Sequence, residues 1–135
     1  MPLVRIDVFQ GRTRGELDAI GEGVHQALVE SIGVPAPDRF QVIAEHGPGG
    51  LVFDPGYLSI ARTRGIVFVQ ITISAGRTLA QKKALFAAIA RNLSSGAAVR
   101  PEDVLVNLIE VSRENWSFGN GVAQYAPSDS EGVSQ

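Results

Sequence analysis

Residues 3–16 read LVRIDVFQGRTRGE, and residues 68–81 read FVQITISAGRTLAQ. In each stretch an alternating apolar segment leads into the tripeptide Gly-Arg-Thr, which begins at Gly11 and again at Gly76. The two tripeptides are 65 positions apart, since 11 + 65 = 76. Alternation at period two is typical of a strand, and glycine marks the turn that ends it. Each stretch therefore predicts a strand, a turn and the start of a helix, so the sequence contains two copies of one structural unit.

The same shift relates much of the remaining sequence. Three helix positions of the first copy coincide with three of the second: Ile20, Val24 and Leu28 fall on Leu85, Ile89 and Leu93. Asp38 falls on Asp103 in the same way. Thr13 and Glu16 form a capping-box pattern at the start of the first helix, and Gly33 is typical of its end. A series of matches at one shift indicates a duplicated structural unit.

Each copy reads as strand, helix and strand. We expect strands at residues 3–9, 40–45, 66–74 and 104–111, a helix that ends at Gly33, a helix over 78–93 that ends near Gly96, and a short strand near 57–61. Strands joined through a helix run parallel, with a right-handed crossover. The duplicated β-α-β units predict an α+β fold of α/β-like character, with a four-stranded sheet and two helices on one face. The bare opposite face indicates a homo-oligomer.

Composition excludes several classes of function. Hydrophobic residues make up 44% and charged residues 19% of the 135 residues, so the chain can bury a core as one domain. The net charge of −2 gives no electrostatic case for nucleic acid or for an anionic membrane. The chain has no cysteine, and its two histidines, His25 and His46, lack ligand spacing, so we expect no metal and no cofactor. We expect His25 on a helix surface. The amino-terminal segment lacks the pattern of a signal peptide, which predicts a cytoplasmic protein.

The predicted domain covers residues 1–127. Its two repeats span about 2–46 and 66–112, joined by a segment rich in glycine and proline and followed by the Trp-Ser-Phe-Gly motif at 116–119. Residues 128–135 are rich in serine and glycine, which predicts a flexible tail.

Pro2 is the first candidate for chemistry. If Met1 is removed, Pro2 carries a free secondary amine, whereas retention of Met1 makes the same nitrogen an amide without basicity. An α-amine has a pKa of roughly 7.7–8.0, which burial lowers and a nearby carboxylate raises. Such an amine can serve as a general acid or base near neutral pH.

The combination of a Met-Pro start, the β-α-β repeat and several local motifs resembles the tautomerase superfamily, and within it malonate semialdehyde decarboxylase and its homologues. The likeness covers nearly the whole chain. Its distinctive pieces are Pro2-Leu3, Gly11-Arg12-Thr13, Val34-Pro35, Asp38-Arg39-Phe40-Gln41, His46, Gln81-Lys82 and Trp116-Ser117-Phe118-Gly119. The resemblance implies the fold of the tautomerases and of macrophage migration inhibitory factor. It also implies an oligomer, which we expect to be a homotrimer.

The resemblance assigns roles to individual residues. Pro2 is expected to transfer protons, Asp38 to set its charge state or orient a water, and Arg77 to bind a substrate carboxylate. The apolar wall of the pocket is expected to comprise Trp116, Phe118 and Tyr125. The family's clamp has another arginine two residues before Arg77, where this chain has Ala75. Candidates to replace it are Arg39, Arg62 and Arg64, and His46 is a candidate for the edge of the site.

The implied activity is that of a cofactor-independent enzyme acting on a small 2-oxo or 3-oxo carboxylic acid. Decarboxylation or hydration follows if Pro2 is cationic, and keto–enol tautomerisation follows if it is neutral. Two alternatives stay open: a non-catalytic trimeric binding or signalling protein of the same fold, and a hydrolytic dehalogenase of 3-haloacrylates.

Overall fold

The computed structural model describes residues 1–127, and the predicted tail at 128–135 lies outside them. The strands are β1 (Leu3–Phe9), β2 (Gln41–His46), β3 (Val67–Ser74) and β4 (Val104–Val111), and the helices are α1 (Arg14–Ile32) and α2 (Leu79–Ala97). Three short 3₁₀ helices complete the elements: η1 (Tyr57–Ser59), η2 (Pro101–Asp103) and η3 (Arg113–Asn115).

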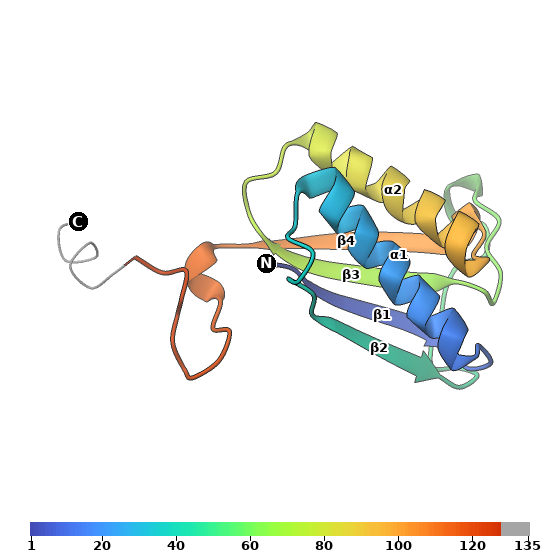
Figure 1. Ribbon diagram of the computed structural model, residues 1–135. Helices are drawn as coiled ribbons and strands as arrows, with labels where there is room; N and C mark the ends of the chain where they lie inside the picture. The colour runs from blue at the N-terminus through green and yellow to red at the C-terminus, as the bar shows by residue number, and fades with distance from the viewer. Residues whose placement is uncertain (128–135) are drawn as a thin grey trace.

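The sheet has four strands in the order β2-β1-β3-β4, and both helices lie on one of its faces (Figure 1). Within each repeat the strands are parallel, β1 with β2 and β3 with β4, as a connection through a helix requires. The two repeats meet along β1 and β3, which run antiparallel. The predicted fold class is therefore confirmed, with a mixed sheet to which both repeats contribute.

A pseudo-twofold axis relates the two repeats. Arg5 pairs with Gln70 at the centre of the β1–β3 ladder, and these two residues are equivalent in the repeat, since 5 + 65 = 70. Leu3 pairs with Thr72 on one side of that centre, and Asp7 pairs with Phe68 on the other. The two ends of the sheet are thus built from equivalent positions, which allows a direct comparison of what each end does.

Both helices begin in the same way. The Thr13 hydroxyl accepts the amide hydrogen of Glu16, whose carboxylate accepts the amide hydrogen of Thr13. Thr78 and Gln81 form the equivalent capping box of α2. Each box satisfies two backbone donors that the first helical turn leaves unpaired. The shared Gly-Arg-Thr signal therefore works identically in both copies.

The helix ends differ in one residue. α1 is capped by Gly33 at φ 71°, and α2 by its repeat mate Ala98 at φ 53°, both in the left-handed region. α2 thus runs through Gly96, where its end was expected, and continues to Ala97. The left-handed conformation costs an L-residue roughly 1–2 kcal/mol because its Cβ crowds the backbone. Alanine at this cap is therefore strained where glycine is not.

We expect Ala98→Gly to raise the free energy of unfolding by about 0.5–1 kcal/mol, after the larger chain entropy of unfolded glycine is allowed for. Gly33→Ala should lower it by about 1 kcal/mol, and this cost is conformational because a Cβ at Gly33 would meet no atom within 4 Å. Urea unfolding measures both changes. Gly96→Ala is the matched control: it lies inside α2 with equally open surroundings, so it should stabilise. A destabilising Ala98→Gly would contradict this account of the caps.

The core lies between the helices and the inward face of the sheet. Its fully buried side chains are aliphatic, and the largest of them are Ile6, Ile20, Leu28, Ile66, Ile71, Ile73, Leu85, Ile89 and Leu93. The other face of the sheet exposes Leu3, Val42, Leu105 and Ile109. The connecting segment covers only one corner of that face, where Phe53 packs edge-on against Phe9 with ring centroids 6.4 Å apart.

One expected element is wrong. The segment near Tyr57 forms the 3₁₀ helix η1 and not a strand, and Leu58 within it has φ 59°. A left-handed residue breaks the extended conformation that strand pairing needs. The segment is held instead by the Arg62 guanidinium, whose Nη1 donates to the carbonyl of Tyr57 at 2.9 Å.

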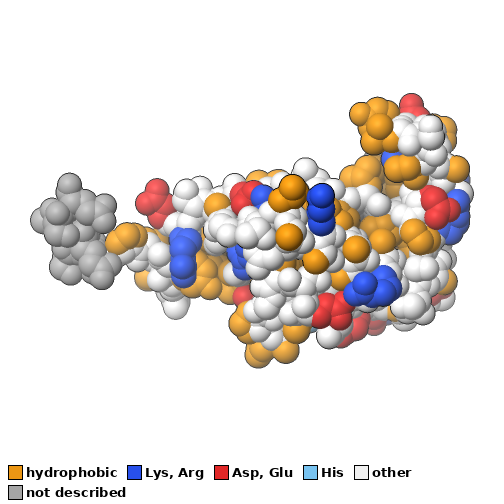
Figure 2. Space-filling model, turned by 90° about the horizontal axis from the view of Figure 1, so that it is seen from above, with side chains coloured by type: hydrophobic (Ala, Val, Ile, Leu, Met, Phe, Trp, Pro, Cys, Tyr) orange, Lys and Arg blue, Asp and Glu red, His pale blue; other side chains and the backbone are white. Residues whose placement is uncertain are grey.

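On the side shown in Figure 2, the surface has no large patch of charge of a single sign. Basic and acidic side chains are interspersed there among apolar and neutral ones. Within residues 1–127, no helix has the length and apolar character that crossing a membrane requires.

Candidate active site

Four segment ends meet at one edge of the sheet: the beginnings of β1 and β2 and the ends of β3 and β4. The antiparallel β1–β3 pairing produces this, because it places Leu3 opposite Thr72, close to the end of β3. In Figure 1 the amino end and the segment that follows β4 lie at this same end of the molecule. Two cavities open here, of about 180 Å³ and 220 Å³, and Met1 lines both.

The smaller cavity is basic. It is lined by Met1, Ser74, Ala75, Arg77, Arg113 and Tyr125. Two guanidinium groups and the α-amino group at Met1 contribute positive charge to it, and none of its lining residues is acidic. This arrangement is suited to an anion.

The larger cavity is apolar. It is lined by Met1, Pro2, Leu3, Phe40, Trp116, Ser117 and Phe118. Pro2 is buried at its base, next to the backbone hydrogen bond of 3.0 Å that the amide of Val4 donates to the carbonyl of Phe40. The amino end of the chain thus lies between a basic compartment and an apolar one.

Asp38 lies beside this amino end. Its Oδ2 is 3.7 Å from the α-amino nitrogen of Met1, and its buried Oδ1 has no hydrogen-bond partner within residues 1–127. A turn closed by the 2.9 Å bond from the amide of Asp38 to the carbonyl of Pro35 positions it. A buried carboxylate oxygen without a partner is costly in a folded protein, which points to a function.

His25, on α1, contacts the turn that carries Asp38. We expected His25 on a helix surface, but it is only 6% exposed, and its Nε2 lies 2.8 Å from the carbonyl oxygen of Ala36. The ring therefore ties α1 to the segment that carries Asp38. Its place in the helix pattern, four residues after Gly21 and three before Leu28, was the signal for burial, because both of these residues are buried.

Arg77 lies just before the first turn of α2. Gly76, at φ 128°, makes the turn out of β3, and Nη1 of Arg77 donates to the carbonyl of Ser74 at 2.9 Å. This bond uses one of the five N–H donors of the guanidinium and leaves the others for a ligand. Nearby, the hydrogen bond from Lys82 lowers the pKa of Glu110 below its ordinary value, and the charge of Arg77 adds to the effect.

The Trp-Ser-Phe-Gly segment forms an aromatic wall. The rings of Trp116 and Phe118 stack with centroids 5.5 Å apart, and Tyr125 meets Phe118 edge-on at 4.8 Å. The indole Nε1 of Trp116 donates to the hydroxyl of Ser74 at 3.1 Å, which anchors the wall to β3. All three aromatic residues predicted for the pocket therefore lie together.

The side chains of two predicted site residues, His46 and Arg39, make contacts away from the two cavities. His46 ends β2 opposite Phe9, about 20 Å along the sheet from Pro2, and its Nε2 is 2.6 Å from Oδ1 of Asp7. Burial opposes ionisation of Asp7, but the hydrogen bonds from His46 and Arg5 outweigh it and lower its pKa. Arg39 turns onto α1, where its Nη1 is 2.5 Å from Oε2 of Glu22. The backbone of Arg39 lies beside Asp38 at the amino end, but within one chain neither His46 nor Arg39 lines the two cavities.

The proposed replacements in the connecting segment also lie away from the site. Arg62 donates to backbone carbonyls of its own loop, and the Arg64 guanidinium lies 4.1 Å above the ring of Phe9. Arg113, which sequence reasoning missed, is the arginine that lines the basic cavity with Arg77. Its position two residues after the end of a predicted strand was the available signal.

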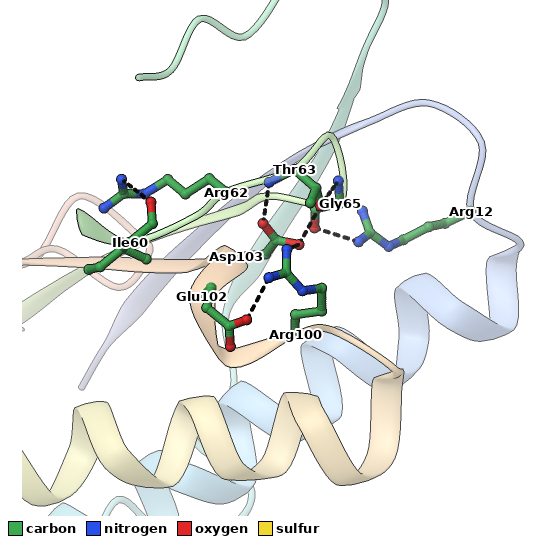
Figure 3. A network of polar contacts seen from close by, with 8 residues as sticks. All are labelled: Arg12, Ile60, Arg62, Thr63, Gly65, Arg100, Glu102 and Asp103. Carbon is green, nitrogen blue, oxygen red and sulfur yellow. Dashed lines mark hydrogen bonds and ion pairs between the residues drawn. The ribbon is translucent and has the colours of Figure 1, made fainter. Parts of the chain in front are cut away.

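The opposite end of the sheet shows what the equivalent positions do without a cavity (Figure 3). Arg12, the repeat mate of Arg77, donates to the carbonyl of Gly65 at 2.7 Å. Asp103, the mate of Asp38, accepts the amide and the hydroxyl of Thr63 at 2.7 Å and 2.6 Å. At this end residues 63–65 satisfy both side chains, whereas at the amino end Arg77 lines an open cavity and Oδ1 of Asp38 is buried without a hydrogen-bond partner within residues 1–127.

Comparisons with known proteins agree with this geometry. A family model described as tautomerase enzyme matches residues 38–119, and a second with the same description matches residues 2–60. The probable tautomerase YusQ of Bacillus subtilis (strain 168) is 40% identical over 124 residues, which cover 92% of this chain and 98% of that protein.

Two solved structures are also similar. FG41 malonate semialdehyde decarboxylase, inhibited by 3-bromopropiolate, is 38% identical with a TM-score of 0.86, over 91% of this chain and 93% of that one. Another malonate semialdehyde decarboxylase, studied for its decarboxylase and hydratase activities, is 33% identical with a TM-score of 0.85, over 91% of this chain and 95% of that one.

Proposed function

The chain belongs to the tautomerase superfamily, and from this premise we propose that it is a cofactor-independent enzyme that uses the amine of Pro2 on a small oxo acid. The substrate class is a 2-oxo or 3-oxo carboxylic acid. The main reaction is decarboxylation or hydration, as in malonate semialdehyde decarboxylase, and keto–enol tautomerisation is a second activity of the same site.

The observation that carries this proposal is the position of the amino end. The α-amino nitrogen of Met1 lies 3.7 Å from Asp38, at the junction of a basic and an apolar cavity. Removal of Met1 transfers the free amine to Pro2, which lines the apolar cavity itself. Because the proline ring restricts the backbone, this amine is held in place at little entropic cost.

The residues of the two cavities divide the chemistry between them. Arg77 binds the carboxylate of the substrate, and the aromatic wall of Trp116, Phe118 and Tyr125 packs against its carbon skeleton. Asp38 favours the protonated form of the Pro2 amine, since a neighbouring negative charge stabilises a cation. A protonated Pro2 can then donate a hydrogen bond to the carbonyl oxygen of the substrate.

Decarboxylation of a 3-oxo acid follows from this arrangement. The bond between C2 and the carboxylate carbon breaks, and its electron pair moves toward the carbonyl that Pro2 polarises. Carbon dioxide leaves as Pro2 protonates the carbonyl oxygen, which gives the enol. C2 of the enol then takes a proton from solvent, and the enol hydroxyl returns its proton to Pro2. In hydration, water adds across a carbon–carbon double bond conjugated with the carbonyl that Pro2 polarises. Asp38 accepts a proton from the water as its oxygen bonds to the β-carbon, and Pro2 gives its proton to the α-carbon. A neutral Pro2 takes a proton from the carbon beside the carbonyl and gives a proton to the carbonyl oxygen, which is keto–enol tautomerisation.

We also propose that the enzyme is a homotrimer. The sheet face opposite the helices exposes Leu3, Val42, Leu105 and Ile109, and burying such a face requires other copies of the chain. Sedimentation equilibrium distinguishes a trimer from the 14.3 kDa monomer.

The proposed function is tested with protein whose loss of Met1 has been established by intact mass. This protein is incubated separately with malonate semialdehyde and with the enol form of a 2-oxo acid, and products are followed by NMR. We expect acetaldehyde and carbon dioxide from the first, and accelerated ketonisation of the second. Absence of turnover of both acids would refute the proposal and favour the non-catalytic alternative.

A further inference from the structure

The basic cavity has two arginines, although position 75, where the clamp of related enzymes has its other arginine, holds alanine. Arg77 enters the cavity from the turn after β3, and Arg113 enters it from η3, which begins two residues after the end of β4. Because β3 and β4 are adjacent and parallel, their ends deliver the two side chains to the same place. The small side chain of Ala75 is part of the same lining.

Arg113 is held firmly where it enters the cavity. On its amino-terminal side the amide of Ala75 donates to the carbonyl of Val111 at 2.9 Å, which extends the β3–β4 pairing. On its carboxyl-terminal side the 3.1 Å bond from Trp116 to Ser74 ties the chain back to β3. A backbone fixed on both sides needs no reordering when Arg113 binds a ligand, so that only side-chain entropy is lost, which favours a role in recognition.

The positive charge of Arg113 has no carboxylate partner in the described part of the chain. Its guanidinium carbon lies 5.1 Å from the centroid of the Tyr125 ring, an arrangement that orients the group. Glu110, the acid near Arg77, is bound by Lys82 at 2.5 Å. Within residues 1–127, neither Arg77 nor Arg113 has a carboxylate oxygen within 4.0 Å of a nitrogen.

We infer that Arg113 is the second carboxylate-binding residue of this enzyme and that it takes the place of the arginine absent at position 75. It grips the substrate carboxylate together with Arg77 and so selects monoanionic oxo acids over their neutral esters. This inference rests on the proposed function for the identity of the substrate, but it also predicts binding of a carboxylate that does not react.

The kinetic test compares Arg113→Gln with wild type on malonate semialdehyde and on its methyl ester. For the acid we expect KM to rise about 10-fold, as for the loss of a charge-assisted hydrogen bond, with kcat changed less than about 3-fold. For the ester, which offers no negative charge, we expect no difference. Arg113→Lys keeps the charge without the planar fork and should fall between wild type and Arg113→Gln. Arg14→Gln, an equal change of charge on the exposed start of α1, is the control.

A double variant tests the replacement itself. Ala75→Arg combined with Arg113→Gln should recover most of the affinity for the acid, because it supplies a guanidinium from the other wall of the same cavity. A KM effect of Arg113→Gln that is equal for acid and ester would overturn the inference, as would no effect on the acid.

A binding measurement separates this inference from the proposed function. Titration with 3-hydroxypropionate, followed through the arginine Nε–H signals in NMR, should give a Kd about 10-fold weaker for Arg113→Gln than for wild type. If wild type binds this acid through Arg113 but turns over neither oxo acid, the proposed function fails and the inference stands. Equal binding by both proteins overturns the inference whatever the turnover.

Discussion

Pro2→Ala lowers kcat for the oxo acid by about 100-fold or more, because general acid–base catalysis by one positioned group contributes roughly 10²–10⁴. The variant keeps an α-amine after loss of Met1, but that amine is no longer fixed by a ring. Protein that retains Met1 should lose still more activity, since the nitrogen of Pro2 is then an amide. Steady-state kinetics on the two forms, each identified by intact mass, measure both effects.

The pH dependence of kcat/KM shows whether the loss of activity comes from the Pro2 amine itself. The limb of the kcat/KM profile that reports the Pro2 amine should be absent from protein that retains Met1 and shifted in Pro2→Ala. Pro48→Ala, at an exposed proline of the connecting segment, is the control and should leave the profile unchanged. Turnover by Pro2→Ala equal to that of wild type would show that the chemistry lies elsewhere.

Asp103→Ala lowers the free energy of unfolding by about 3 kcal/mol, the largest loss of stability that we expect from a polar residue here. Asp103 is only 2% exposed, and it accepts both the amide and the hydroxyl of Thr63. Removing the carboxylate leaves these two donors without an acceptor, at roughly 1–3 kcal/mol each. Asp103→Asn keeps one acceptor and should lose about half as much.

The repeat mate of Asp103 should behave in the opposite way. Asp38→Asn removes a contact of 3.7 Å and leaves no donor unsatisfied, so we expect a change in stability below about 1 kcal/mol but a loss of most of the turnover. Thermal unfolding at one protein concentration, which matters for an oligomer, and kcat for each variant provide the comparison. Equal destabilisation by both substitutions would contradict the division into a structural and a functional end.

Much of the fold was readable from the repeat. The Gly-Arg-Thr tripeptides marked both strand-to-helix turns, and both have the capping geometry that their local residues require. The exceptions are local as well: η1 replaced the expected short strand, and α2 passed through Gly96 to end at Ala97, with Ala98 as its cap. In each case a left-handed residue without glycine, Leu58 or Ala98, gave no sequence signal.

The candidate site was readable only in part. Pro2, Asp38, Arg77 and the aromatic residues of the last segment were named as candidates from motifs, and they lie around the same pair of cavities. His46 and Arg39 were named on the same grounds but line neither cavity, while Arg113, which lines one of them, belonged to no motif. A motif records which residue types occur together, but it does not record which end of a sheet each one reaches.

The sequence by itself determined the duplicated strand–helix–strand unit, because strand alternation, capping and turns depend on neighbours a few residues apart. Only the tertiary structure decided how the two units meet. The antiparallel contact of β1 with β3 joins segments 65 positions apart, and no local pattern specifies its direction. That contact places the amino end beside Arg77 and Arg113. It places Arg12 and Asp103 at the other end of the sheet, where their hydrogen bonds stabilise the fold.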